Sequence, residues 1–468
     1  MTSFDRLTID LAEYTKFWEL NNYSFLWHDI FVYSVYNDRL IENILGVQEE
    51  NLLCVCKEGK YSFYLKNTEI EKNKRQVLEF FTSLSYDKFV KSIKQILIEV
   101  EQLPWEVKYT DWKEKFEWLS KKHTEASSLY FCTESYYVDC IYDHLIDLGY
   151  EKEDVLKYTV LSKKPKLIEE QLEWYDLIVN KHNNKDTNPL IENHFNKWKN
   201  IIAKTRMDPY TIDVLHKRYE KDIENIDAVK QAHQEITTRR STENIEKMIT
   251  VSKSIFDEKS YLLIRRLSEI SYLRFELRRV WMKTGYLLRI LLQKTFKKNE
   301  SVFECSANEI LNEDISDYDD RNSFIYYADE QNSLLFYNNS QLKRVEFIGE
   351  DSQENSNEVY GKISFGIDVH GYAYVLENNR CLLDALEFVN KDTILILPQL
   401  SPEHIPLLGI CKGIVVDEGG IAGHASIIAR EMKKPAILGT VNGSRRIKNN
   451  ERIHLDIISN CVRRTNFV

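Results

Sequence analysis

Apolar residues recur at helical intervals from about Tyr14 to Asn299. The clearest run begins near Lys259, and its apolar positions, three and four residues apart, are Leu263, Leu267, Ile270, Leu273 and Leu277. This spacing places the side chains on one face of an α-helix. We therefore expect a mostly α-helical region that ends with a long amphipathic helix.

The other face of this expected helix is rich in arginine: it carries Arg266, Arg274, Arg278 and Arg279. A charged helix face is most often solvated or ion-paired. The alternative is a wall of cations that faces a phosphorylated intermediate. On that alternative Arg274 and Arg278 are candidate substrate-domain residues, and only their geometry separates the two interpretations.

Alternating apolar positions predict short strands on both sides of the helical region. The run NLLCVCKEGKYSFYL is typical of a hairpin that turns at Glu58 and Gly59. A second group of strands, SFIYYAD, SLLFYN and LKRVEFIG, follows the helices. After it comes the polar stretch DSQENSNE, residues 351–358, which has no periodicity and is predicted to be a linker.

The remaining chain, about Val359 to Thr465, has the pattern of a small α/β domain. Its strand-like runs are TILILPQ, GIVVDE, PAILGT and RIHLDI, with a helix between the second and the third. The predicted organisation is therefore multidomain. A mostly α-helical domain occupies residues 1–350, the linker residues 351–358 and the small α/β domain residues 359–468.

Composition and charge limit the function classes. A length of 468 residues suffices for two or three domains, and 43% hydrophobic residues suffice for ordinary cores. The formal net charge of −10 argues against a surface that binds nucleic acid or anionic lipid. No stretch approaches eighteen apolar residues, and the first residues lack the pattern of a signal peptide. We expect a cytoplasmic protein without membrane association, whose abundant Asn, Lys and Ile suggest an AT-rich bacterial genome.

The 8 cysteines are scattered, and the only close pair is Cys54 and Cys56. Alternate residues on a strand point the same way, so this pair is expected to pack side by side. A metal site would favour two residues between its ligands. No metal site is predicted.

Glycine is distributed very unevenly. The first 349 residues contain five of the 15 glycines, namely Gly46, Gly59, Gly149, Gly285 and Gly349, and no two lie within ten residues of each other. A loop that cradles phosphate with backbone N–H groups needs glycines close together. The chemistry is therefore expected in the C-terminal domain.

The stretch GIVVDEGGIAGHASIIAREMKKPAILGT predicts a strand, a glycine turn, a helix and a second strand. The turn contains Gly419, Gly420 and Gly423, and the helix is expected to begin at His424. Its apolar stripe is Ala425, Ile428, Ala429 and Met432, and Pro435 follows it. His424 is thereby placed at a helix N-terminus, where free N–H groups and the helix dipole attract negative charge.

Other glycine-rich motifs do not fit this stretch. A Walker loop requires Lys followed by Ser or Thr, and a dinucleotide fingerprint requires G-x-G-x-x-G in a larger sheet. An isolated histidine is most often a helix cap or a core residue. The spacing around His424 favours instead a residue that accepts a phosphoryl group.

The motif GG-x-x-x-H-A-x-x-x-A-R-E, followed by P-A-I-L-G, closely resembles the mobile-domain signature of the phosphoenolpyruvate-utilising enzymes. This family includes phosphoenolpyruvate synthase, pyruvate phosphate dikinase and rifampicin phosphotransferase. The resemblance implies a swivelling phosphohistidine domain with His424 as its catalytic carrier. Gly419, Gly420, Gly423 and Arg430 are the residues expected to stabilise the phosphoryl group, although Arg430 is as readily explained by a surface ion pair with Glu431 or Asp417.

The resemblance extends loosely to the helical region, because YTKFWELNNYSFLW and LRFELRRVWMKTGYLLRILLQ are similar to the substrate domain of the rifampicin-phosphotransferase type. Two parts of the family pattern are not found, the ATP-grasp domain and the barrel that binds phosphoenolpyruvate. This implies an ATP-grasp partner protein in trans, as in the split arrangement of phenylphosphate synthase. ATP and Mg would then act through that partner, with no cofactor bound directly.

The acceptor is expected to be a small organic molecule, by default a hydroxyl compound. Asp139, Asp143 and His144 share one helical face, and of these Asp143 and His144 are kept as possible substrate-domain residues. The predicted function is an ATP-dependent, dikinase-like phosphotransferase component. Two alternatives stay open: a ligase component that activates a carboxylate as an acyl phosphate, and a non-catalytic carrier or regulatory protein.

Overall fold

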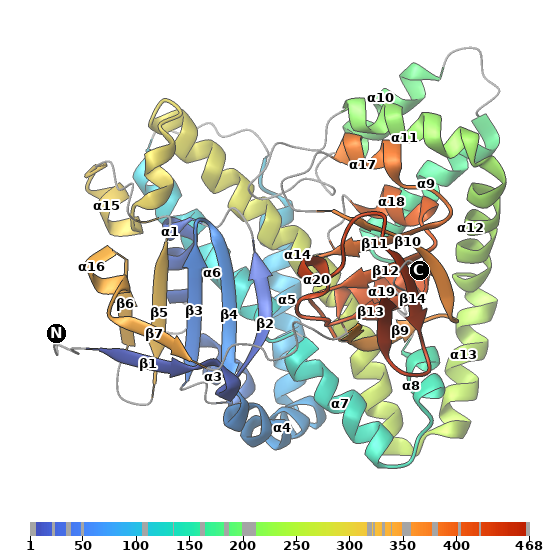
Figure 1. Cartoon of the computed structure of the whole chain (residues 1–468), viewed down its shortest axis with the longest axis horizontal. Coiled ribbons are helices and arrows are strands. Elements are labelled where there is room, and N and C mark those ends of the chain that lie inside the picture. Colours follow the sequence, from blue (N-terminus) through green and yellow to red (C-terminus); the bar gives the residue numbers. More distant parts are fainter. Residues whose placement is uncertain are drawn as a thin grey trace. The chain divides into compact units, whose positions relative to one another are not determined.

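The chain divides into two compact units, each built from two separate stretches of sequence (Figure 1). The first unit comprises Met1–Tyr137 and Val280–Asn355, and the second comprises Val138–Arg279 and Ser356–Val468. The computed structural model describes residues 6–20, 24–33, 39–47, 51–104, 111–133, 135–159, 164–181, 187–198, 212–315, 321, 323–329, 333–337, 339–348, 357–376, 382–400, 404–420 and 423–464.

The first unit contains a five-stranded antiparallel sheet with the order β2-β4-β3-β5-β6 and a separate parallel pair, β1 and β7. The strands are β1 (Leu7–Asp10), β2 (Tyr14–Leu20), β3 (Leu52–Lys57), β4 (Lys60–Lys66), β5 (Phe324–Ala328), β6 (Ser333–Phe336) and β7 (Val345–Ile348). The helices are η1 (Leu11–Glu13), α1 (Phe25–Trp27), η2 (His28–Tyr33), α3 (Leu40–Leu45), α4 (Asn67–Thr82), α5 (Ser85–Glu101), α6 (Trp112–Phe131), η3 (Glu300–Glu304), α15 (Ala307–Leu311) and α16 (Asn339–Leu342).

The predicted hairpin is confirmed. Strands β3 and β4 pair antiparallel, and Glu58 and Gly59 between them both have a left-handed backbone, with φ of 50° and 76°. Two left-handed residues in a two-residue loop match the twist of the flanking strands. The sequence did not predict that β5, from the far end of the chain, would pair with β3 and complete this sheet.

The second unit combines a helical part, residues 138–279, with a C-terminal segment, residues 357–464. The helices of the helical part are α7 (Ser135–Asp147), α8 (Lys152–Tyr158), α9 (Lys166–Lys181), α10 (Asn188–Trp198), α11 (Ile212–Glu224), α12 (Ile226–Arg239), α13 (Thr242–Ile255) and the first part of α14 (Glu258–Thr295). The predicted long helix is therefore confirmed as α14. Its five predicted apolar positions are all buried, at 3% exposure or less.

The C-terminal segment forms an eight-stranded sheet with the order β8-β15-β14-β10-β11-β12-β13-β9. Its strands are β8 (Glu358–Tyr360), β9 (Lys362–Phe365), β10 (Val369–Val375), β11 (Thr393–Leu397), β12 (Gly413–Val416), β13 (Ala436–Leu438), β14 (Arg452–Asp456) and β15 (Cys461–Arg464). Its helices are α17 (Leu382–Phe388), α18 (Ile405–Ile410), α19 (His424–Glu431) and α20 (Gly443–Arg446). The four central strands, β10 to β13, run parallel, so the predicted α/β character is confirmed.

The central strands of this sheet are apolar on both faces. Leu395 and Val416 join a core that contains α17, α18 and α19 and extends to Trp174 and Tyr175 of α9. Their neighbours in sequence, such as Ile396, face a second core made with β14 and β15. Parallel strands covered on both sides have this continuous apolar pattern. The first of the two cores joins the C-terminal segment to the helical part.

The boundaries of the two compact units differ from those of the predicted domains. The predicted domain boundaries stay a prediction. Residues 138–279 lie within the predicted 1–350 domain, yet they group with the C-terminal segment. Most of the predicted linker, residues 351–356, lies outside the described residues. Its end is fixed to the sheet, because the Arg464 N–H donates to the Asn357 carbonyl at 2.9 Å.

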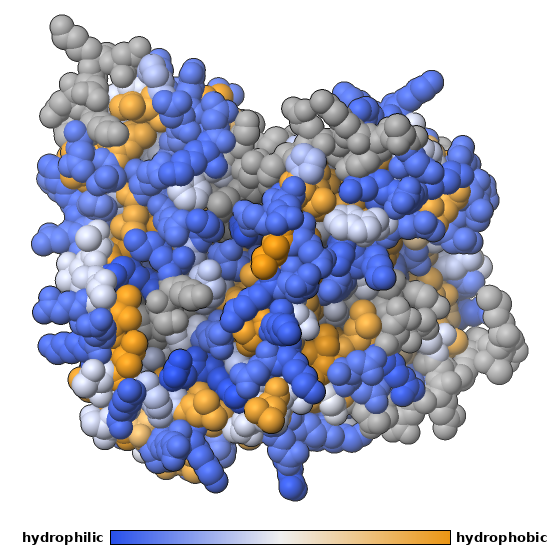
Figure 2. All heavy atoms as spheres, turned by 180° about the vertical axis from the view of Figure 1, so that it is seen from behind, coloured by the Kyte–Doolittle hydropathy of each residue, from blue (hydrophilic) through white to orange (hydrophobic). Residues whose placement is uncertain are grey.

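The surface is mostly hydrophilic on the face turned away in Figure 1, where apolar residues appear in small groups (Figure 2). Within the described ranges, no helix has the length and apolar character needed to cross a membrane.

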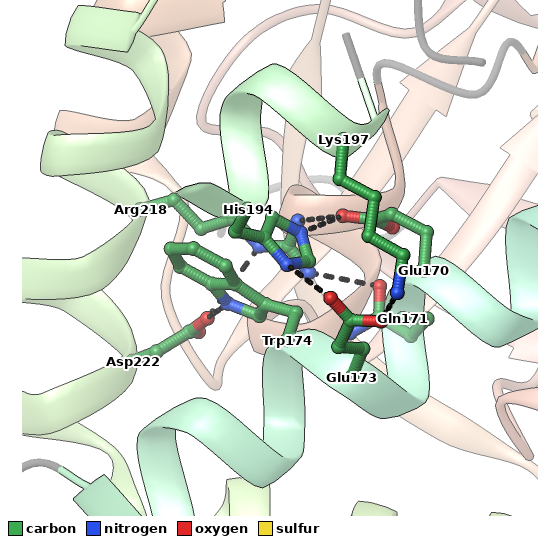
Figure 3. A network of polar contacts seen from close by, with 8 residues as sticks. All are labelled: Glu170, Gln171, Glu173, Trp174, His194, Lys197, Arg218 and Asp222. Atoms are coloured by element: carbon green, nitrogen blue, oxygen red, sulfur yellow. Dashed lines mark hydrogen bonds and ion pairs between the residues drawn. The ribbon is translucent and has the colours of Figure 1, made fainter. Parts of the chain in front are cut away.

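A buried polar network links helices α9, α10 and α11 (Figure 3). Arg218 donates to Glu170 Oε1 at 3.2 Å and to Gln171 Oε1 at 2.9 Å, and its guanidinium lies 4.5 Å from the Trp174 ring centre. His194 Nε2 lies 3.0 Å from Glu170 Oε1. Burial alone would raise the pKa of Glu170, but the charge of Arg218 and the hydrogen bond from His194 outweigh burial, so this pKa lies below its usual value.

We expect Arg218→Met to lower the free energy of unfolding of the second unit by roughly 3–5 kcal/mol, because it leaves Glu170 as a buried charge without its cation. Urea unfolding followed by tryptophan fluorescence measures this loss. Lys217→Met is the matched control on the same helix: its ion pair with Glu387 is partly exposed, at 25% for Lys217 and 57% for Glu387, and is worth about 1 kcal/mol or less. Equal losses in both variants would contradict the importance of the network.

Candidate functional site

The predicted strand, glycine turn and helix are present. Strand β12 ends at Val416, and helix α19 begins at His424 with Gly423 as an extended N-cap residue. Gly419 has φ of +102°, a backbone conformation that favours glycine. The Gly423 N–H donates to the Gly420 carbonyl at 3.0 Å and closes the turn.

Helix α19 is held in the core by its apolar stripe. Ala425, Ile428 and Ala429 are at most 6% exposed and anchor the helix in the core. The first hydrogen bond within the helix runs from the Ile427 N–H to the Gly423 carbonyl, at 3.1 Å. The amides before Ile427 in the first turn thus have no partner within the helix, and the positive end of the helix dipole lies there.

Asp417, which precedes the GG-x-x-x-H-A motif, holds the start of the glycine turn through hydrogen bonds. Asp417, 8% exposed, accepts from Thr440 Oγ1 at 2.8 Å and from the Ser444 N–H at 3.0 Å. Gly439 lies against the backbone of Gly419. A Cβ at position 439 would be only 2.7 Å from the Gly419 carbonyl oxygen. The segment after β13 therefore packs directly against the glycine turn.

Helix α7 meets the glycine turn at Asp139, a residue of the face that the sequence singled out. A Cβ on Gly420 would lie 2.1 Å from Asp139 Oδ2, so only glycine leaves room for this carboxylate. Asp139 is 6% exposed, and its Oδ2 accepts from Lys362 Nζ at 2.9 Å. The structure thus brings a buried carboxylate of the helical part against the turn that precedes His424.

Lys362, at the start of β9, was not predicted, and the sequence around it carries no motif. Burial alone would lower the pKa of Lys362, but the charges of Asp139 and Asp143 outweigh burial, and the pKa lies above its usual value. Lys362 is therefore a stable cation beside the glycine turn. Asp143 is exposed and His144 half-buried on the same helix, and their assignment to an acceptor site stays a prediction.

Arg430 lies at the opposite end of α19 from His424. The two positions are six steps of helical rise apart, or about 9 Å along the axis. Arg430 is 6% exposed, so the interpretation as a surface residue is wrong. Burial and the carboxylates of Asp143 and Asp139 raise the pKa of Tyr142, and the positive charge of Arg430 opposes this rise. Because Tyr142 belongs to α7, Arg430 lies near that helix. A role in stabilising phosphate stays a prediction.

Arg274 and Arg278 are both 5% exposed, so the solvated-face interpretation is wrong for them. Arg278 Nη1 donates to the Leu400 carbonyl at 3.3 Å. Leu400 follows β11, and the glycine turn follows the adjacent parallel strand β12. The carboxyl ends of adjacent parallel strands lie on the same side of a sheet. Arg278 therefore contacts the side of the sheet on which the glycine turn begins.

No group of three or more His, Cys, Asp or Glu side chains in the described part of the chain is arranged to hold a metal ion. Lys362 is a side-chain cation beside the turn, because it donates to the Asp139 carboxylate that contacts Gly420.

Comparison with known proteins matches residues 389–459 to the family described as PEP-utilising enzyme, mobile domain. This match covers that segment of the chain alone. A phosphoenolpyruvate synthase of Aeropyrum pernix is 32% identical over 73 residues, which are 16% of this chain and 9% of the relative. A phosphoenolpyruvate-protein phosphotransferase of Buchnera aphidicola subsp. Baizongia pistaciae is 35% identical over 111 residues, 23% of this chain and 19% of the relative.

The resemblance seen in the sequence is thereby confirmed, and residues 389–459 are a phosphoryl-carrying domain. They include the whole glycine turn and α19. The chain spans less than a fifth of the length of these relatives.

We expect Gly420→Ala to lower the free energy of unfolding of the second unit by about 1–3 kcal/mol, because its Cβ would overlap the Asp139 carboxylate. In the double variant Gly420→Ala/Asp139→Ala the overlap is gone, so the loss should be smaller than the sum of the two single losses. Gly409→Ala is the control, because its Cβ would meet Tyr175 Oη at an ordinary 3.5 Å. Additive losses in urea unfolding would show that Asp139 does not press against the turn.

Proposed function

We propose that the chain is a phosphotransferase component in which His424 accepts a phosphoryl group from a separate ATP-grasp protein and passes it to a small organic acceptor. The observation that supports this most is the position of His424. It opens α19 directly after a glycine turn, at the edge of a parallel sheet, within a domain of the PEP-utilising mobile-domain family. ATP and its Mg²⁺ would bind to the partner.

The proposed chemistry has two transfers. An imidazole nitrogen of His424 attacks the donated phosphorus, an N–P bond forms and the P–O bond to the nucleotide breaks. The acceptor oxygen then attacks the same phosphorus, the N–P bond breaks and the acceptor proton leaves to a base. A free imidazole is a competent nucleophile near neutral pH, because its ordinary pKa is about 6.5.

Phosphoryl transfer depends mainly on positioning and on neutralising charge. The amides at the start of α19, which have no partner within the helix, would supply hydrogen bonds to the phosphoryl oxygens. Lys362 adds a full positive charge beside the glycine turn, and Asp139 holds it there. These groups support a role of this edge in stabilising a transferring anion.

The proposal requires the C-terminal segment to move, because one histidine must reach a donor on another protein and an acceptor in the helical part. Contacts between the helical part and the C-terminal segment are polar as well as apolar: Arg240 pairs with Glu431, Lys217 with Glu387, and Asp139 with Lys362. Residues 351–358 are the proposed pivot. The acceptor is proposed to carry a hydroxyl group.

Given an ATP-grasp partner and ATP labelled in either the β or the γ phosphoryl group, the chain should gain one acid-labile phosphate on His424. His424→Ala should gain none, because the accepting nitrogen is gone. His454→Asn is the matched control in the same domain and should be labelled like the unchanged chain. Mass spectrometry at neutral pH locates the phosphate, and label on His424→Ala would refute the assignment. The chain alone with ATP should remain unlabelled.

Linking the C-terminal segment to the helical part should prevent phosphorylation. Lys217→Cys and Glu387→Cys place two thiols on α11 and α17 where an ion pair now forms, remote from the glycine turn. The described native cysteines are buried, and Cys381 is changed to Ser in the same background. A bis(methanethiosulfonate) cross-linker, which forms one disulfide with each cysteine and releases sulfinate, should abolish labelling of His424 by the partner, and reduction of the disulfides should restore it.

Each single-cysteine variant, treated in the same way, controls for modification without a link. If the linked protein is labelled at the unlinked rate, the partner reaches His424 in the docked state and the proposed movement is wrong.

A further inference from the structure

A hollow lies in the second unit, at the end of α19 where Arg430 lies. Its volume is about 1230 Å³, more than the roughly 300–1000 Å³ that pockets for small organic molecules occupy. Its walls come from α8, α12 and α13 of the helical part and from β9, α19 and the β14–β15 turn of the C-terminal segment. The described glycines of the turn, Gly419, Gly420 and Gly423, are not among its lining residues.

One face of helix α13 lines this hollow. The lining residues are Asn244, Lys247, Met248 and Val251, whose spacing of three, four and seven places them on one side of the helix. Ser252 is the buried residue of α13. The apolar side chains of Met248 and Val251 therefore border the hollow rather than a core.

The opposite wall is also apolar. Ile363 and Phe365 of β9 line the hollow together with Ile457 and Ile458. Ile458 is 88% exposed, an unusual position for a large aliphatic side chain beside a concave surface. An exposed apolar surface in a hollow is typical of a ligand-binding site.

Positive charge gathers around these apolar walls. Lys157, Lys247, Arg430 and Lys433 line the hollow, whereas Glu235 is its acidic residue. Glu235 pairs with Lys433 at 3.3 Å, so the hollow retains an excess of cations although the whole chain has a net charge of −10. Lys157 lies over the Tyr158 ring at 5.0 Å.

We propose that this hollow is a binding site for an amphipathic organic anion, a molecule with an aromatic or aliphatic body and a carboxylate, phosphate or sulfonate group. The body lies between α13 and β9, and Lys157 and Lys247 bind the anionic group. The site is separate from the glycine turn, and the proposal does not rest on phosphorylation of His424. Because both parts of the second unit form the walls, a bound anion also joins them.

The test uses 8-anilinonaphthalene-1-sulfonate, a fluorescent aromatic sulfonate, at micromolar concentrations with the folded 468-residue chain. We expect one saturable site. Lys247→Glu should weaken binding about tenfold, because it replaces an attraction to the sulfonate with a repulsion. Met248→Gln should weaken it several-fold by making the apolar wall polar at nearly constant size.

Two controls lie on other sides of the same helix. Lys253→Glu and Ile249→Gln repeat the charge and polarity changes outside the lining of the hollow, and they should leave the affinity unchanged. N-phenyl-1-naphthylamine, which has the same body without the sulfonate, should bind at least tenfold more weakly. His424→Ala should bind the sulfonate like the unchanged chain.

Three results would overturn the proposal. Equal affinity of Lys247→Glu and Lys253→Glu would place the probe elsewhere. Equal binding of the uncharged probe would show that the site does not select an anion. Absence of saturable binding would show that the hollow is not a site, while leaving the proposed transfer through His424 untouched.

Discussion

A buried ion pair between Arg240 and Glu431 constrains how the C-terminal segment lies against the helical part of the second unit. The Arg240 Nε–H donates to Glu431 Oε2 at 3.0 Å, and Nη2 lies 2.7 Å from Oε1. Both side chains are at most 3% exposed. Arg240 ends α12, and Glu431 is the last residue of α19. The pair therefore fixes the helix that begins with His424 to the helical part.

Such a pair determines orientation more than it adds stability. Removing two charges from water nearly cancels the attraction between them, and only the loss of one partner is strongly unfavourable. A C-terminal segment held by Arg240 and Glu431 can thus have one preferred position without being bound irreversibly. Separation would return both charges to water together. The movement proposed for the C-terminal segment would require such a near cancellation of charge attraction by the cost of removing the charges from water. The apolar core shared with α9 supplies the remaining attraction.

Local sequence predicted the parts of this fold that are local. The start of α19 at His424, the turn at Glu58 and Gly59 and the long helix α14 follow from backbone preferences and periodicity. The pairing of β5 with β3 and the contact of Asp139 with Gly420 join residues hundreds of positions apart. No spacing rule connects such residues, and their side chains take part in no motif. The same reason explains why Lys362 and Arg240 were missed, and why α14 contributes to two units where one domain was expected.

The contact between Asp139 and Gly420 also affects the electrostatics of the proposed transfer. In the docked state the glycine turn already has one carboxylate against it, and Lys362 balances that charge. A phosphoryl group on the residue that opens α19 would add about two negative charges near the same turn. One lysine cannot balance all of them, so the phosphorylated form is held less tightly than the free form at this contact. The proposed delivery to an acceptor in the helical part would therefore require further cations near the carboxyl ends of the strands. The buried guanidinium of Arg278, which donates to the Leu400 carbonyl just after β11, is a candidate for this role.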